Sequence, residues 1–150
     1  KITAFQLAVA QVSRAPDAMP QTLLWGWESM EGLATVWIGW EGTPLRLTVR
    51  LIPQSGFGWQ VWTGPVVDPG TAWRAQVALH PGLGPGGVLY RQDEQAPWQS
   101  LSTTSSKGLE DLAWPRSWLV GNGPSGAGEW PCRGLGLQLH WMQVPLPPLT

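Results

Sequence analysis

The sequence predicts an all-β fold, a two-sheet antiparallel sandwich with at most one short helical turn. Three observations support this prediction. Apolar and polar residues alternate with a period of two in several short runs, turn residues separate these runs, and no stretch of ten residues between them has helical spacing. The 19 Gly and 15 Pro residues also interrupt the chain every few positions, which argues against long helices.

The clearest strand pattern lies at residues 45–51, which read Leu-Arg-Leu-Thr-Val-Arg-Leu. Because successive side chains of a strand point to opposite faces, the Leu and Val residues share one face and the Arg and Thr residues the other. This pattern predicts an antiparallel strand with one buried face. Strand character is also present at residues 5–9, 22–27, 33–40, 57–63, 73–79, 88–92, 117–121 and 135–141. About nine short strands at this spacing are typical of a sandwich or barrel.

We expect a single β-sandwich domain at residues 1–143 and an extended Pro-rich C-terminal arm at residues 144–150. A chain of 150 residues has the length of one domain with a core of its own. The Pro residues of the arm lack an N–H group, so the arm cannot pair in the middle of a sheet. The one helical turn is expected at residues 108–114, where Leu109 and Leu112 lie three positions apart.

The net charge of −1 is spread along the chain without a basic run. Binding to nucleic acid or to an anionic membrane surface depends on clustered positive charge, so we expect neither partner. The longest apolar stretches are far shorter than the ~20 residues that span a bilayer, and we expect no membrane insertion.

Candidate acid–base residues do not form a catalytic pattern. Asp93 and Glu94 are adjacent, as are Glu110 and Asp111, so on a strand each pair would point to opposite faces. A glycoside hydrolase needs its two carboxylates on one side of the substrate. We therefore expect that the chain is not an enzyme.

Metal and cofactor motifs are also not expected. His80 and His140 stand apart, without a Cys or carboxylate at ligand spacing, and structural roles are expected for both. Residues 82–87 satisfy the pattern G-x-G-x-x-G, but Val-Leu-Tyr resumes as a strand directly afterwards. A dinucleotide site would need a helix there, so we predict a hairpin loop with Gly at positive φ. The lone Cys132 cannot form an internal disulfide and is expected to be a small buried hydrophobe.

Twelve Trp residues in 150 are the unusual feature of the composition. Trp98, Trp114 and Trp130 each neighbour a Pro in loop-like segments, where full burial is not expected. Each could fold back as a lid over an end of the sandwich, anchor a subunit interface or stack on a sugar ring. These three are the candidate ligand- or interface-binding residues.

Two parts of the sequence carry a family resemblance. Residues 70–79 read Gly-Thr-Ala-Trp-Arg-Ala-Gln-Val-Ala-Leu, and Val-Leu-Tyr follows at 88–90 after a Gly-rich turn. Residues 118–121 read Trp-Leu-Val-Gly, and Cys-Arg-Gly-Leu-Gly-Leu follows at 132–137. These runs resemble a laminin-G-type module of the concanavalin A-like lectin superfamily. The resemblance implies a jelly-roll sandwich, leaves room for a calcium site, and implies recognition as the function.

We therefore expect a non-catalytic, lectin-like recognition or assembly module without a cofactor. We expect its setting to be the surface of a phage or virus particle, as a decoration, fibre or tail protein, or the extracellular space. The grounds are the low charge, the loops rich in aromatic residues and Pro, a Pro-Leu tail suited to lying on a neighbour, and the lack of a catalytic pattern. The expected partners are neighbouring subunits in a homo-oligomer and, as a further possibility, host glycan. The alternatives are a secreted carbohydrate-binding module of a polysaccharide-degrading enzyme and, third, a glycoside hydrolase.

Overall fold

The computed structural model describes residues 3–9, 21–27, 34–51, 60–67, 73–106, 117–120 and 138–142. Within these residues it contains eleven β-strands and one 3₁₀ segment, and the predicted two-sheet antiparallel sandwich is confirmed. The strands are β1 (Thr3–Val9), β2 (Gln21–Trp27), β3 (Ala34–Glu41), β4 (Arg46–Leu51), β5 (Gln60–Val66), β6 (Trp73–Leu79), β7 (Val88–Arg91), β8 (Gln99–Ser100), β9 (Ser102–Thr103), β10 (Ser117–Val120) and β11 (Gln138–Met142).

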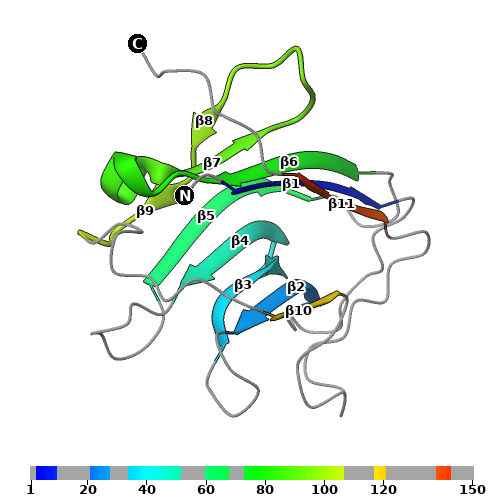
Figure 1. The fold of residues 1–150 in the computed structure, drawn as a ribbon, viewed down its shortest axis with the longest axis horizontal. Coiled ribbons are helices and arrows are strands. Elements are labelled where there is room, and N and C mark those ends of the chain that lie inside the picture. The colour runs from blue at the N-terminus through cyan, green and yellow to red at the C-terminus, as the bar shows by residue number, and fades with distance from the viewer. Residues whose placement is uncertain are drawn as a thin grey trace.

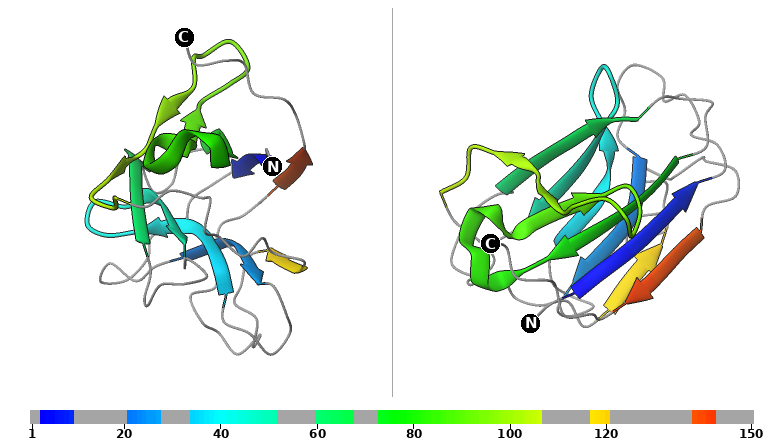
Figure 2. Two further views of the ribbon diagram at one scale, coloured as in Figure 1. Left: turned by 60° about the vertical axis from the view of Figure 1, so that its left-hand side comes forward. Right: turned by 90° about the horizontal axis from the view of Figure 1, so that it is seen from above.

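The strands form a five-stranded and a six-stranded sheet, stacked as two layers (Figure 1; Figure 2, left). The five-stranded sheet has the order β11-β1-β6-β7-β8, and the six-stranded sheet has the order β10-β2-β3-β4-β5-β9. The N-terminal strand β1 lies inside its sheet, antiparallel to β11 and to β6. Seen from above, β11, β1, β6 and β7 run side by side (Figure 2, right).

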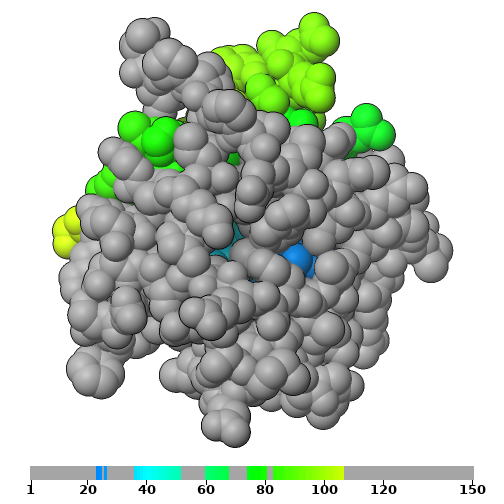
Figure 3. All heavy atoms as spheres, in the orientation of Figure 1, coloured from blue at the N-terminus to red at the C-terminus, as the bar shows by residue number. Residues whose placement is uncertain are grey.

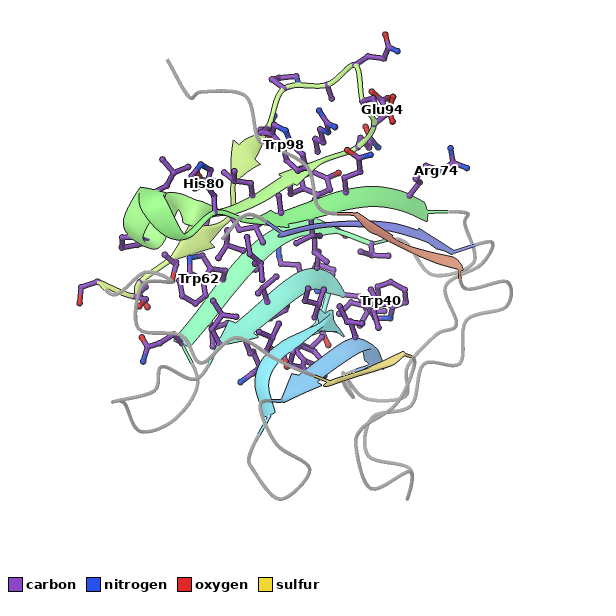
Figure 4. All side chains as sticks on the ribbon, viewed as in Figure 1. Trp40, Trp62, Arg74, His80, Glu94 and Trp98 are labelled. Atoms are coloured by element: carbon purple, nitrogen blue, oxygen red, sulfur yellow. The ribbon has the colours of Figure 1, made fainter. Side chains whose placement is uncertain are left out.

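Alternation along the strands builds the core between the sheets. In β4, Leu47, Val49 and Leu51 are buried, and they pair with the buried residues Trp40, Ile38 and Val36 of β3. Val77 and Leu79 of the five-stranded sheet join the same buried cluster. Trp40 and Trp62 fill the space between the layers and are fully buried (Figure 4). Burial of such large side chains supplies most of the stabilisation of a sandwich.

All nine predicted strand regions contain a strand, with small shifts at the ends. The largest shifts are at β5, which was predicted at residues 57–63 and runs from Gln60 to Val66, and at the start of β11, which was predicted at residue 135 and begins at Gln138. The sequence did not predict β8 and β9, which have two residues each and therefore no period to detect. The polar face expected for the strand at 45–51 is exposed at Arg46 but buried at Thr48, whose hydroxyl donates to the carbonyl of Arg46 at 3.1 Å.

The glycine-rich connection between β6 and β7 is a 3₁₀ segment, Pro81–Gly87, rather than a plain loop. The positive φ predicted there is found at Gly84, with a φ of 61°. Trp62 holds this segment to the core, because its indole Nε1 donates to the carbonyl of Pro85 at 2.8 Å. The predicted helical turn at 108–114, the arm at 144–150 and Cys132 lie outside the described residues.

Candidate functional site

The chain changes sheets at residues 99–103, and this crossing closes one edge of the sandwich. Strand β8 pairs with β7 in the five-stranded sheet, and two residues later β9 pairs with β5 in the six-stranded sheet. Leu101 lies between the two strands and anchors the crossing: its side chain is buried, and its backbone N–H donates to the carbonyl of Val88 at 2.9 Å. The hydroxyl of Thr103 donates to the carbonyl of Val61 at 2.7 Å and fixes β9 on β5.

A hollow of about 240 Å³ opens beside this crossing. It is lined by residues 63–65 of β5, by Tyr90 of β7 and by residues 99–102, and we call it the sandwich-edge pocket. None of the described residues that line it is charged, although Nη1 of Arg46 donates to the carbonyl of the wall residue Gly64 at 3.3 Å. The volume is below the ~300–1,000 Å³ of sites for drug-sized ligands, so the pocket suits one small ring rather than a long molecule.

A bulge in β5 shapes one wall of the pocket. The register between β4 and β5 shifts between the pairs Arg46–Val66 and Thr48–Thr63, so Gly64 and Pro65 both lie opposite Leu47. A β-bulge is one of the few places where a sheet tolerates Gly and Pro in sequence. Glycine is also needed for space, since a Cβ at Gly64 would lie 2.7 Å from Cδ2 of Leu101.

Most polar side chains that line the pocket have no hydrogen-bond partner among the described residues. Ser100 donates its hydroxyl to the carbonyl of Gly86 at 2.9 Å. Within the part of the chain that the structure describes, the side chains of Thr63, Tyr90, Gln99 and Ser102 make no hydrogen bond to the protein. Burial raises the pKa of the Tyr90 phenol above its ordinary value of 10.0, so at neutral pH it stays an uncharged donor and acceptor. The pocket therefore presents neutral hydroxyl and amide groups to a ligand.

Trp98, one of the three predicted site residues, lies on the outer face of the five-stranded sheet, the face that points away from the six-stranded sheet (Figure 4). It follows the loop at residues 92–97, which projects from the molecule in the space-filling view (Figure 3). Asp93 forms the turn of this loop, since its Oδ1 accepts the N–H groups of Gln95 at 2.8 Å and Ala96 at 3.0 Å.

The turn brings Trp98 back onto the buried pair Ala78 and Leu89, against which Leu83 also packs, and Trp98 is half-buried there. This contact is that of a lid, one of the three roles considered for the residue, although the lid covers the outer face and not an end of the sandwich. The Nε1 of Trp98 is buried and has no hydrogen-bond partner among the residues that the structure describes. A ligand or interface role of Trp98 stays a prediction.

An arginine and a glutamine adjoin Trp98 on the same face. Arg91 pairs with Gln76 across β7 and β6, and its Nε donates to the Oε1 of Gln76. The guanidinium carbon of Arg91 lies 4.2 Å from the centre of the Trp98 ring, which is a cation–π distance. Arg91 and Gln76 could not be predicted from the sequence, because their contact depends on the register of two strands.

The other predicted site residues, Trp114 and Trp130, lie outside the described residues. His80 is half-buried where β6 meets the 3₁₀ segment, and its backbone N–H donates to the carbonyl of Gly87 at 2.7 Å (Figure 4). Among the residues described, no three His, Cys, Asp or Glu side chains gather where they could share a metal ion. None of the described helical structure is long and apolar enough to cross a membrane.

No family model, no curated protein and no solved structure matches this chain in comparisons of its sequence and fold.

Proposed function

We propose that this chain is a non-catalytic, lectin-like recognition module whose sandwich-edge pocket binds one ring of a neutral saccharide. The observation that carries the proposal is the chemistry of the pocket. Hydroxyl and amide groups such as those of Tyr90 and Gln99, which have no hydrogen-bond partner among the described residues, can bind the hydroxyls of a sugar ring, and none of the described lining residues carries a charge that would favour an ion.

Two features of the fold support a role in binding. The pocket lies between β5, β7 and the crossing at residues 99–103, so paired backbone elements fix its walls. Hydrogen bonds from Ser100 and Thr103 to backbone carbonyls hold that crossing in place. A site whose shape is fixed before binding loses less conformational entropy when the ligand binds.

For the biological setting we propose the surface of a phage or virus particle or another extracellular surface, with the chain assembled as a homo-oligomer. The low charge and the family resemblance described above support this setting. The rival is a secreted carbohydrate-binding module, which would bind the same class of ligand as a monomer. Light scattering on the full chain separates the two, because a trimer or larger assembly is expected for the first and a monomer for the second.

Binding to an array of neutral glycans, followed by calorimetric titration with the retained sugar, tests the function. We expect Tyr90→Phe and Gln99→Ala to weaken binding by about tenfold each, because each removes one hydrogen bond of roughly 1.4 kcal/mol. Ser106→Ala is the matched control, since Ser106 is exposed and does not line the pocket. If no neutral glycan is retained, or if the control weakens binding as much as Tyr90→Phe, the proposal is wrong.

A further inference from the structure

We propose that Arg91, on the outer face of the five-stranded sheet, binds the carboxylate of an acidic saccharide. The proposal rests on saccharide recognition as the proposed function, but it concerns a second site. Arg91 and the pocket residue Tyr90 are neighbours in β7, and successive side chains of a strand point to opposite faces. One sugar ring in the pocket therefore cannot also contact Arg91 across the sheet.

Arg91 is held in place on two sides. Its Nε donates to Gln76, which is 1% exposed and therefore a fixed partner, and the ring of Trp98 lies against its guanidinium. Holding a free arginine side chain in one arrangement costs rotamer entropy, and here that entropy is already lost before any ligand binds. The terminal nitrogens of Arg91 make no hydrogen bond to a described residue.

The charge of Arg91 is also unpaired in the described part of the chain. The salt bridge that the structure describes joins Arg50 and Glu41, which belong to the other sheet. Arg74, two positions before Gln76 on the same face of β6, is exposed and adds a second positive charge (Figure 4). A fixed, half-buried guanidinium with free terminal N–H groups matches the two oxygens of a carboxylate.

The neighbouring loop favours a singly charged ligand over a polyanion. Asp93 and Glu94 are exposed and follow Arg91 by two and three positions, so they repel a ligand with closely spaced negative charges. The same loop carries Gln92 and Gln95, exposed neutral amides that can bind hydroxyl groups. A uronic acid, with one carboxylate and several hydroxyls per ring, fits these groups better than an acidic peptide run or a sulfated polymer.

Calorimetric titration of the full chain with methyl glucuronoside and with methyl glucoside tests the site. We expect tighter binding of the acidic sugar than of the neutral one. Arg91→Lys should reduce the ratio of the two affinities by about tenfold, because lysine keeps the charge but cannot bind the carboxylate in a bidentate manner. Glu94→Gln is the matched control with the opposite expected effect: it removes a negative charge near the site and should strengthen binding of the acidic sugar by about two- to threefold. Nuclear magnetic resonance of the arginine Nε–H groups adds a direct readout, in which the Arg91 signal should shift on binding.

Each outcome decides for or against the proposal. Equal affinity for the two sugars, or an Arg91→Lys variant with an unchanged preference, overturns it. Tighter binding of glucose 6-sulfate or of a poly-glutamate peptide overturns the choice of a carboxylate sugar. Tyr90→Phe should leave the preference for the acidic sugar unchanged, so the pocket and the Arg91 site can fail independently.

Discussion

Two indole groups differ in how their nitrogen atoms are satisfied. The Nε1 of Trp62 donates to the carbonyl of Pro85, whereas the Nε1 of Trp98 is buried without a partner in the described part of the chain. A hydrogen bond contributes about 1 kcal/mol net, and an unsatisfied buried polar group costs about 1–3 kcal/mol. The same Trp→Phe substitution should therefore affect the two positions differently.

We expect Trp62→Phe to lower the free energy of unfolding by about 2–3 kcal/mol, from lost packing and from the carbonyl of Pro85 that loses its donor. Trp98→Phe should lower it by less than about 1 kcal/mol, because removal of the unpaired N–H offsets part of the lost packing. Urea unfolding of the full-length variants measures both values. Equal losses at the two positions would contradict this account of the indole nitrogens.

The bulged strand β5 has a sequence that looks unfavourable for a strand. Gly64 and Pro65 follow each other in it, and both residues are depleted in sheets. The structure explains both positions. The described pairing of β9 with β5 is confined to Trp62 and Thr63, so no paired residue of β9 lies opposite Pro65 and needs the N–H group that proline lacks. Gly64 leaves room for the side chain of Leu101.

Gly64→Ala should lower the free energy of unfolding by about 1–2 kcal/mol, because the new Cβ meets the side chain of Leu101. Leu101→Ala alone should cost about 2–3 kcal/mol by leaving a cavity. In the double variant the alanine at position 64 no longer meets Leu101, and its remaining neighbours, Cβ and Cδ2 of Leu47 at 3.4 Å, are in ordinary van der Waals contact, so its own cost should fall to near zero. A double-mutant cycle from urea unfolding gives the coupling, and strictly additive costs would mean that the two side chains do not meet.

Strands could be predicted from the sequence where apolar and polar residues alternate several times along the strand. The run at 45–51 predicts its buried face correctly, because the three apolar side chains of β4 recur at every second residue and all are buried. Strands β8 and β9 are fixed instead by pairing with β7 and β5, partners that no local pattern reveals. The sandwich-edge pocket depends on these two strands, so the pocket could not be predicted from the sequence. Trp98, which the sequence did indicate as a candidate residue, does not line it.

At the scale of the whole molecule, alternation predicts which side chains face inward but not which strands are neighbours. Strand β1 pairs with β11 and β6, and β10 pairs with β2, so the sheets join segments that are distant along the chain. These pairings result from the packing of the complete core. The same packing sets the environment of Tyr90, whose neighbours come from β6 and β8 and from the pocket wall of β5.

Tyr90 is the single tyrosine of the chain, so its ionisation can be followed without interference from other phenols. Burial disfavours the phenolate and raises the pKa of Tyr90 above 10.0 in the folded protein, while the unfolded chain keeps the ordinary value. The folded state therefore binds this proton more tightly, and its stability is unaffected below pH 10 but falls as the pH rises through the folded pKa. Tyr90→Phe should remove this part of the alkaline loss.

Ultraviolet absorbance of tyrosinate during an alkaline titration measures the pKa, and urea unfolding at neutral and at strongly alkaline pH measures the loss of stability. A neutral sugar in the sandwich-edge pocket should raise the pKa further, because the ligand excludes water from the phenol and binds its neutral form. Methyl glucuronoside bound at Arg91 should leave the titration unchanged, since that site lies on the opposite face of the sheet. A titration at the ordinary value, or the same alkaline loss in Tyr90→Phe, would show that the pocket does not enclose the phenol.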